Sequence, residues 1–325
     1  MAPCGPSYGR DMRTLTVVEF GPPTALEIID TPSPSPGVED VVVRVVGAGV
    51  NWIDVSLRAG RLAHGGLLAP ADRYGLGWDV AGVVEAVGAE VRSHAVGDHV
   101  IGLRDVLGLP GTHAELVRLH QSAVVAVPEH RDLVGLAGLP LAGVTAVGAL
   151  AATGLDAGDT LLVTGAGGVV GRLCVALALV RGIRVVAAGR TKDVDQISNL
   201  GAELVDPDAL AAGGGLVTEV RRLLGRGVDA VVDTANLGVA AHEAVRGAGT
   251  FVALVRPFAP LPLRGTTVVV HESWADPAAL GEVAHQLEAG TIEPPEVIAT
   301  PLDEAAAAHT ALEAGGVRGR IVLVP

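Results

Sequence analysis

The feature that most constrains this chain is a predicted strand that runs into a glycine-rich turn and then into a predicted helix. Residues 161–171 read Leu-Leu-Val-Thr-Gly-Ala-Gly-Gly-Val-Val-Gly. The glycines of this segment are Gly165, Gly167, Gly168 and Gly171. Glycine permits a tight turn, lets backbone N–H groups approach a pyrophosphate, and allows a helix to pack closely on a strand. The N-terminus of the predicted helix adds partial positive charge, and Val169 and Val170, just before it, are expected to contact the cofactor. The pattern predicts a dinucleotide-binding site, with a plain structural turn as the alternative.

The loop after the next predicted strand, residues 184–188, bears on which dinucleotide binds. A site for NAD(H) is expected to carry an acidic residue about 20 residues after the first glycine, where it holds the ribose hydroxyls. Here the sequence reads Gly189, Arg190, Thr191 and Lys192. An acidic side chain would repel a 2′-phosphate, whereas two cations attract it. The loop therefore favours NADP(H) over NAD(H), unless Arg190 and Lys192 are ordinary solvated charges.

The hydrophobic pattern changes near residue 129. Before it, short β-rich segments alternate with Gly, Pro and Asp, which predicts a mostly β region. The strands expected there are residues 14–20, 26–29, 41–46, 80–87, 100–103 and 116–127. After it, strands and helices alternate, which predicts a parallel sheet covered by helices. The expected strands are residues 160–164, 184–188, 230–232, 251–254 and 267–270, and the helices are 171–180, 193–200, 217–224 and 240–245. Helices 277–288 and 303–313 and a strand at 320–324 complete the chain.

Composition excludes several classes of protein. The chain of 325 residues is 49% hydrophobic and 18% charged, which is unlike a disordered sequence. Its net charge of −13 argues against nucleic-acid binding, which depends on Lys and Arg contacts to phosphate. Residues 133–155 carry no charge, but five glycines and a proline favour a buried segment over a membrane span. The first twelve residues do not resemble a signal peptide, so we expect a cytoplasmic protein without membrane association.

Motifs along nearly the whole chain resemble the medium-chain dehydrogenase/reductase superfamily, and most closely its zinc-independent quinone oxidoreductase branch. The matching segments are residues 47–51, 77–79, 81–88, 96–100, 139–146, the glycine turn, 200–202, 229–233 and 317–323. The resemblance implies a GroES-like catalytic domain formed by residues 12–130 and 272–325. It implies an inserted Rossmann NADP(H)-binding domain at residues 131–271, with the active site between the two. It also implies a homodimer that pairs residues 267–270 of two Rossmann sheets.

The resemblance assigns roles to several single residues. It places Asn51 against the nicotinamide and the substrate, and Thr145 against the nicotinamide carboxamide. It places Arg320 where some relatives hold the pyrophosphate, and Leu254 and Arg256 just after the strand beneath the nicotinamide. The structural alternatives are an Asn that stabilises a turn, a residue that begins a helix, and a surface arginine.

Three further residues are candidates for proton transfer. Some quinone oxidoreductases carry a tyrosine five residues after the asparagine, and this position is Ser56 here, which keeps a shorter hydroxyl. Family position places residues 61–74 at the mouth of the active site, where Tyr74 or His64 is a candidate proton donor. A satisfied surface group is the alternative for either residue.

The sequence predicts no metal site. Zinc-dependent relatives have a histidine beside the Gly77 turn, where this chain has Trp78, and no cysteine lies between Cys4 and Cys174. Without a Lewis acid, hydride addition to a conjugated acceptor is easier than alcohol oxidation. We therefore expect an NADPH-dependent reductase of a quinone or an α,β-unsaturated carbonyl. The alternatives are an enoyl or carbonyl reductase that tailors a biosynthetic, polyketide-like intermediate, and an NADPH-binding structural or sensory protein.

Overall fold

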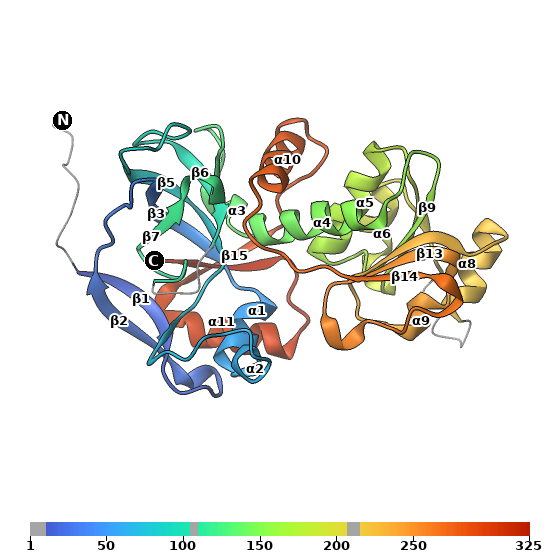
Figure 1. The fold of residues 1–325 in the computed structure, drawn as a ribbon, viewed down its shortest axis with the longest axis horizontal. Coiled ribbons are helices and arrows are strands. Elements are labelled where there is room, and N and C mark those ends of the chain that lie inside the picture. Colours follow the sequence, from blue (N-terminus) through green and yellow to red (C-terminus); the bar gives the residue numbers. More distant parts are fainter. Residues whose placement is uncertain (1–10, 105–109, 207–214) are drawn as a thin grey trace. The chain divides into compact units, whose positions relative to one another are not determined.

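The computed structural model describes residues 11–104, 110–206 and 215–325, and the chain divides into two compact units. The first unit comprises Met1–Leu141, Trp274–Ala284 and Pro294–Pro325, and the second comprises Ala142–Ser273 and His285–Glu293. Figure 1 shows the ribbon coloured along the sequence. The domain bounds expected from the sequence stay a prediction, because compactness does not show that a unit folds alone.

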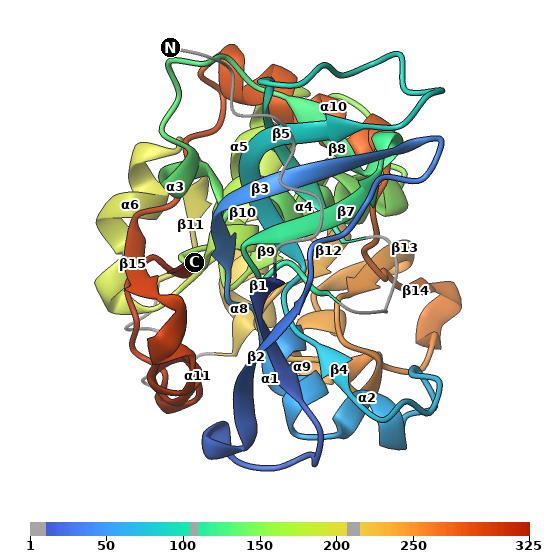
Figure 2. The ribbon, with the colours of Figure 1, turned by 90° about the vertical axis from the view of Figure 1, so that its left-hand side faces the viewer.

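The first unit is built mainly from strands. A seven-stranded sheet has the order β15-β16-β3-β5-β6-β8, with β7 also paired to β3, and a smaller sheet has the order β2-β1-β4. The strands are β1 (Asp11–Val17), β2 (Leu26–Pro32), β3 (Asp40–Gly49), β4 (Tyr74–Gly75), β5 (Asp79–Val87), β6 (His99–Leu103), β7 (Leu116–His120), β8 (Val124–Ala126), β15 (Val297–Pro301) and β16 (Arg320–Val324). Strand β3 is rich in valine, which favours extended backbone, and Figure 2 shows it beside both β5 and β7.

The end of the chain completes the sheet that its beginning forms. Strand β16 pairs antiparallel with the end of β3, with Val322 opposite Gly49 and Leu323 opposite Ala48. The unit's helices are α1 (Trp52–Arg58), α2 (Arg61–His64), α3 (Leu133–Leu136) and α11 (Ala305–Ala314), with 3-10 turns η1 (Pro23–Ala25), η2 (Gln121–Ala123) and η6 (Leu302–Glu304). The pairing with β3 brings Arg320, the first residue of β16, close to the segment that follows β3.

Helices α1 and α11 pack through one apolar core and one partly buried ion pair. Leu57 of α1 and Ala305 of α11 belong to a single buried cluster with β-strand residues. Arg58 is only 2% exposed, and its two terminal nitrogens donate to the carboxylate of Glu313 at 3.1 and 2.7 Å. Because a buried guanidinium is costly without a partner, this bidentate contact fixes the two helices together.

The second unit is a six-stranded parallel sheet with the order β11-β10-β9-β12-β13-β14. Its strands are β9 (Thr160–Thr164), β10 (Arg184–Ala188), β11 (Glu203–Leu204), β12 (Val228–Asp233), β13 (Val245–Ala253) and β14 (Thr267–Val270). Numbered within the unit, this order is 3-2-1-4-5-6, which is that of a doubly wound dinucleotide-binding sheet. The predicted fold class, a GroES-like mostly β domain plus a Rossmann sheet, is confirmed.

Helices cover this sheet from both sides. They are α4 (Pro140–Thr153), α5 (Val169–Val180), α6 (Val194–Asn199), α8 (Leu216–Leu224) and α9 (Val239–His242), with 3-10 turns η3 (Thr191–Asp193), η4 (Arg256–Phe258) and η5 (Leu263–Gly265). A further helix, α10 (Pro277–Glu288), contains a boundary between the two units. Leu162 packs in one buried cluster with Val220 of α8 and Ala241 of α9. Its neighbours Leu161 and Val163 are equally buried and point to the other face, because side chains alternate along a strand.

Two predicted segments take a different form in the structure. The predicted helix over residues 240–245 ends at His242, and Val245 instead opens β13 opposite Val228. β-branched Val245 is buried in the sheet pairing there, which outweighs its place in a short helical pattern. The uncharged segment 133–155 holds α3 and α4, and no helix in the described ranges is both long and apolar enough to cross a membrane.

Candidate functional site

The glycine turn between β9 and α5 has a backbone that only glycine can supply. Gly165 has a φ of +61°, and a Cβ on Gly171 would lie 2.3 Å from the carbonyl oxygen of Gly165. A Cβ on Gly167 would lie 2.4 Å from Cγ of Asp193. Helix α5 begins at Val169, and by helix geometry its first-turn N–H groups have no acceptor inside the helix. This cradle fits the pyrophosphate of a dinucleotide.

A buried acid–hydroxyl network holds the turn from the neighbouring strand. Asp233 ends β12 with 1% exposure, and its carboxylate accepts from the hydroxyl of Thr164 at 2.5 Å and from the backbone N–H of Gly238 at 2.8 Å. The hydroxyl of Thr234 donates to the carbonyl oxygen of Thr164 at 2.6 Å. Strands β9 and β12 are neighbours with connections that run in opposite directions, which is where open parallel sheets bind ligands.

The loop after β10 contains both cations and an acid. Arg190 and Lys192 are exposed, and Gly189 precedes them at the carboxyl end of the strand. Asp193 is 9% exposed, lies against Gly167, and accepts a hydrogen bond from Nε of Arg190 at 3.2 Å. The basic character of this loop is thus partly offset by a carboxylate at the glycine turn. The sequence pattern gave no reason to expect this contact.

A hydroxyl–imidazole chain lies beyond the carboxyl ends of β13 and β14. The hydroxyl of Thr145 is 2.8 Å from that of Ser273, which is 3.3 Å from Nε2 of His271. Leu254 is half-buried just after β13, and the exposed Arg256 is ion-paired with Glu272. Thr145, Leu254 and Arg256 were predicted cofactor contacts, and the structure places all three near this edge of the sheet.

In the first unit, Asn51, Asp79 and Arg320 come together. Asn51 is 5% exposed, and its side-chain N–H donates to Asp79 at 2.8 Å and to the carbonyl oxygen of Gly49 at 3.2 Å. Arg320 donates to the amide oxygen of Asn51 and lies 3.5 Å from the Asp79 carboxylate. The backbone N–H of Leu141 donates to the other oxygen of Asp79 at 2.6 Å. Three segments distant in sequence therefore fix one amide group.

The Asp79 carboxyl is fully buried, and its acidity reflects this. Burial raises the pKa of Asp79 to about 6, against the opposing influence of the Arg320 charge and the hydrogen bond from Asn51. A Cβ on Gly49 would lie 2.5 Å from Asp79, so this glycine makes room for the carboxylate. Gly49 ends β3, and Asp79 begins β5, which is antiparallel to β3.

A second carboxylate, Asp54, supports the start of α1. It accepts from the backbone N–H of Asn51 at 2.8 Å and from that of Gly77 at 2.8 Å. His113 is buried beside this segment, and its Nε2 is 3.1 Å from the carbonyl oxygen of Gly49. Burial lowers the pKa of His113, although the Asp54 charge opposes that shift. The backbone around Asn51 is thus held from two sides.

The three predicted proton-transfer candidates lie in different surroundings. His64 ends α2, and its Nδ1 is 2.8 Å from the carbonyl oxygen of Gly60. Ser56 is half-buried on α1. Tyr74 is 9% exposed, stacks on Phe20 at 5.3 Å, and donates its hydroxyl proton to the carbonyl oxygen of Ala69 at 3.1 Å. The same hydroxyl accepts from the backbone N–H of Ala71 at 3.0 Å. The hydroxyl of Tyr74 therefore organises its own loop, and the role of each of the three residues in proton transfer stays a prediction.

The residues present do not fit a zinc ion. Trp78 offers no ligand, and the adjacent Asp79 is already bound to Asn51, Leu141 and Arg320. Across the described part of the chain, no three His, Cys, Asp or Glu side chains gather as a metal site. Cys174 lies inside α5, and burial raises the pKa of its thiol to about 12, so it remains a protonated thiol at neutral pH.

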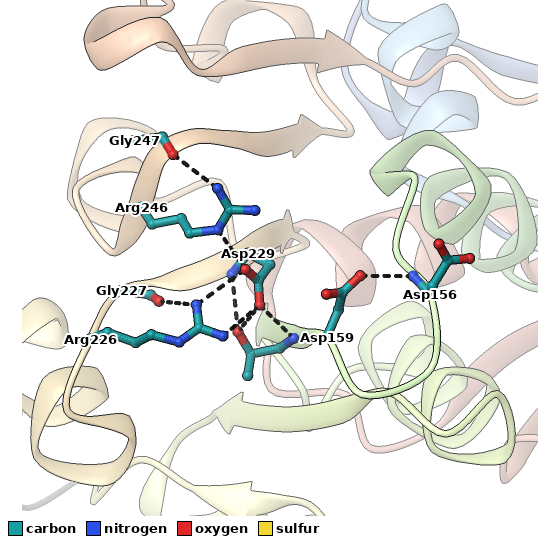
Figure 3. A network of polar contacts seen from close by, with 8 residues as sticks. Asp156, Asp159, Arg226, Gly227, Asp229, Arg246 and Gly247 are labelled. Atoms are coloured by element: carbon teal, nitrogen blue, oxygen red, sulfur yellow. Dashed lines mark hydrogen bonds and ion pairs between the residues drawn. The ribbon is translucent and has the colours of Figure 1, made fainter.

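The other end of the parallel sheet carries an ion-pair network (Figure 3). Asp229 accepts from Arg226 at 2.9 Å, from the hydroxyl of Thr160 at 2.6 Å, and from Arg246. Burial alone would raise the pKa of Asp229, but these hydrogen bonds hold it well below its usual range. Thr160 begins β9, so this network ties the amino ends of the strands and lies at the edge opposite the glycine turn.

Comparison with known proteins agrees with this architecture. Residues 37–129 match the alcohol dehydrogenase GroES-like domain, and residues 201–323 match the zinc-binding dehydrogenase family. An NAD-dependent alcohol dehydrogenase from Sulfurisphaera tokodaii is 29% identical over 97% of this chain and 100% of its own length. A 2-methylene-furan-3-one reductase from Solanum lycopersicum is 26% identical over 98% of this chain and 80% of its length.

Among solved structures, a quinone oxidoreductase from Pseudomonas syringae pv. tomato is 26% identical, with a TM-score of 0.82 over 97% of this chain and 100% of that one. The family matches and these relatives identify the class of protein as an oxidoreductase that uses a nicotinamide cofactor. The chain belongs to the medium-chain dehydrogenase/reductase superfamily, in its quinone oxidoreductase-like branch.

Sequence reasoning missed three polar side chains that the structure brings to these regions. Asp193 lies on the glycine turn, and Ser273 and His271 extend from Thr145. His271 follows β14 directly, at the carboxyl end of a parallel strand, which is a position that often carries function. That position was the available signal, since no motif marks these residues.

Proposed function

We propose that this protein is an NADPH-dependent, zinc-independent reductase that transfers hydride to a quinone or an α,β-unsaturated carbonyl compound. The observation that carries this proposal is the Asn51–Asp79–Arg320 cluster, an amide, a carboxylate and a guanidinium bound to one another. Asp79 follows Trp78, which stands where zinc-dependent relatives have a histidine. A conjugated acceptor spreads developing negative charge onto a distant oxygen. Hydrogen-bond donors then suffice where alcohol oxidation would call for a Lewis acid.

The second unit supplies the cofactor site in this proposal. Bound NADPH provides the hydride from its nicotinamide ring. The residues proposed to hold it at the phosphate end are Gly165, Gly167, Gly168, Val169, Val170, Gly189, Arg190 and Lys192. Thr145, Leu254 and Arg256 are proposed to surround the nicotinamide, because they lie beyond the carboxyl ends of the strands.

The preference for NADPH rests on the loop after β10. Arg190 and Lys192 are both exposed there, and position 189 carries no acidic side chain. Asp193 weakens this preference because it pairs with Arg190. The Nε of Arg190 contacts Asp193 while most of its side chain is exposed, so its guanidinium remains accessible to a 2′-phosphate.

The first unit is proposed to act on the substrate. Asn51 would donate a hydrogen bond to the acceptor oxygen, with Arg320 adding positive charge beside it or holding the pyrophosphate. Turning the amide toward a substrate costs it the contact with Asp79, which Arg320 would still neutralise. The second hydrogen of the reduced product arrives as a proton, for which Ser56 and Tyr74 are the proposed sources.

Strand β14 is the proposed dimer contact. It forms one edge of the parallel sheet, and its three valines are half-buried. Several large hydrophobic side chains around this end of the unit are exposed: Leu237, Val239, Val255, Phe258, Leu261 and Leu263. An exposed edge strand with apolar surroundings favours association with a second copy.

A cytoplasmic location of the protein stays a prediction.

The decisive experiment measures NADPH oxidation against a panel of quinones, enones, enoyl thioesters and saturated carbonyl compounds. Asn51→Ala is expected to lower kcat by about 100- to 1,000-fold, the usual effect of removing one donor to a developing oxyanion. Asn199→Ala, on the exposed end of α6, is the matched control and should leave kcat unchanged.

Different outcomes separate the alternatives. Activity confined to enoyl thioesters or to saturated carbonyl compounds would favour the biosynthetic reductase. Tight NADPH binding without turnover of any acceptor would exclude an enzyme of this kind and favour an NADPH-binding structural or sensory protein.

A further inference from the structure

Thr145, Ser273 and His271 form a row of hydrogen-bonded side chains. In this row, the direction of the hydrogen bond at one end determines the direction at the other. The Thr145 and Ser273 hydroxyl oxygens are 2.8 Å apart, and the Ser273 oxygen is 3.3 Å from Nε2 of His271. A hydroxyl group carries a single proton, so Ser273 can donate toward only one of these two neighbours at a time. The state of the imidazole therefore determines what Ser273 offers to Thr145.

Neighbouring residues fix the position of the His271 imidazole ring. The backbone N–H of His271 donates to the carbonyl oxygen of Ala253 at 2.9 Å, which continues the β13–β14 pairing. The ring lies against Gly148 of α4, where an added Cβ would be 2.3 Å from Cε1 of the imidazole. Glycine at position 148 thus makes room for the ring, and no other residue type would leave it in place.

Few charges surround this ring within the second unit. Helix α4 carries no ionisable side chain along Pro140–Thr153. Burial lowers the pKa of His271, and the neighbouring Glu272 opposes that shift. Glu272 is itself ion-paired with Arg256. The imidazole is therefore neutral at pH 7, and Nε2 is available as an acceptor for the Ser273 proton in one of its two tautomers.

Protonation of His271 at Nε2 reverses the direction of the hydrogen bonds between His271, Ser273 and Thr145. When Nε2 carries a proton it becomes a donor, so Ser273 accepts from the ring and its own proton turns toward Thr145. With the neutral ring accepting, Ser273 donates to His271 and accepts from Thr145. Thr145 thus meets a donor in one state and an acceptor in the other, which changes how its hydroxyl can engage a carboxamide.

We propose that His271 is a positioning residue that acts through Ser273 to orient the hydroxyl of Thr145 for the nicotinamide carboxamide. This inference rests on the proposed function, in which Thr145 contacts the nicotinamide. It makes binding of the nicotinamide half of the cofactor dependent on the protonation state of His271, and leaves the adenosine half unaffected.

The test compares two ligands by calorimetry, NADPH and 2′,5′-ADP, which lacks the nicotinamide. His271→Phe keeps a ring beside Gly148 without the nitrogen, and Ser273→Ala breaks the chain while retaining His271. Each should weaken NADPH binding about 5- to 10-fold and leave 2′,5′-ADP binding unchanged. His242→Phe is the matched control, because His242 also bonds a threonine hydroxyl, that of Thr266 at 2.8 Å, in the same unit.

The pH profile adds a readout that loss of packing would not produce. Wild-type affinity for NADPH should fall more steeply below pH 6.5 than affinity for 2′,5′-ADP, and Ser273→Ala should remove that difference. If both ligands bind but neither variant changes NADPH affinity or its pH profile, the inference is wrong and the proposed function stands. If neither ligand binds the wild-type protein, the proposed cofactor itself is wrong.

Discussion

At the scale of single residues, the site depends on side chains that neutralise one another. Arg320 sits beside Asp79 and Asn51, and Arg190 sits beside Asp193. In each case a cation proposed to meet the cofactor or substrate is already paired with a carboxylate in the free protein. Such pairing holds the cation in place, and it also reduces the net positive charge that a ligand meets. In the proposed function, the balance of these two effects at Arg190 contributes to the preference for NADPH over NADH.

Arg190 and Asp193 give a prediction of opposite sign for two neighbouring substitutions. Arg190→Ala should weaken NADPH binding about tenfold, or about 1.4 kcal/mol, because a charge-assisted contact to the 2′-phosphate is lost. Asp193→Asn should strengthen NADPH binding several-fold, because the competing carboxylate is gone. Fluorescence titration with NADPH and NADH checks both, and Lys192→Ala measures the second cation.

NADH provides the control for this comparison, since it lacks the 2′-phosphate and should bind both variants as it binds the wild-type protein. Unchanged NADPH affinity in Arg190→Ala and in Lys192→Ala would remove the basis for the NADPH preference. The protein would then group with its NAD-dependent relatives.

At the scale of elements, local sequence predicted the strands better than the contacts between them. Strands β9, β10, β14 and β16 begin and end where their valine-rich segments and flanking turns indicate. The predicted strand over residues 116–127 is instead divided by the turn η2, and α1 and β15 were not predicted. These elements depend on partners distant in sequence, such as β16 for β15.

The candidate site also has a part that local sequence predicts and a part that it does not. The glycine turn was predictable because its chemistry lies in consecutive residues. The approach of Arg320 to Asn51 was not, because it arises from the register in which β16 pairs with the end of β3. Ser273 and Thr145 are in contact although 128 positions separate them in the sequence, so no local pattern connects them or His271.

The edge strand β14 gives a prediction at this scale. His271 N–H bonds to Ala253 of β13, so by strand alternation the N–H of Val270 points to the open edge of the sheet. Val270→Pro removes that outward donor without breaking the β13 pairing, and should convert a strand-paired dimer into a monomer. Light scattering after size-exclusion chromatography measures the mass, and circular dichroism verifies the fold. A dimer that persists would place the contact elsewhere.

At the scale of the whole molecule, buried titratable groups make stability depend on pH. Burial lowers the pKa of four histidines, His113, His242, His271 and His309, spread over both units. Each binds a proton more readily when unfolded, so each removes stability as pH falls below about 6.5. Asp79 has the opposite effect. Its carboxyl binds a proton near pH 6 in the folded protein but only near pH 3.8 in the unfolded chain, so it adds stability as pH falls between these values. The histidines outnumber it, so net stability should fall with acidification.

His309 isolates the effect, because its imidazole is buried and lies outside the proposed site. It is 0% exposed on α11, and within the described chain neither ring nitrogen has a hydrogen-bond partner. Burial, with the charges of His113 and Arg58, lowers the pKa of His309 to about 3. The unfolded chain protonates this side chain near pH 6.5 and the folded chain does not, which costs about 2 kcal/mol of stability at pH 5. His309→Leu should therefore raise the free energy of unfolding by that amount at pH 5 relative to its effect at pH 8. His285→Leu, on α10, is the control, and equal shifts for His309→Leu at both pH values would show that His309 is protonated in the folded protein.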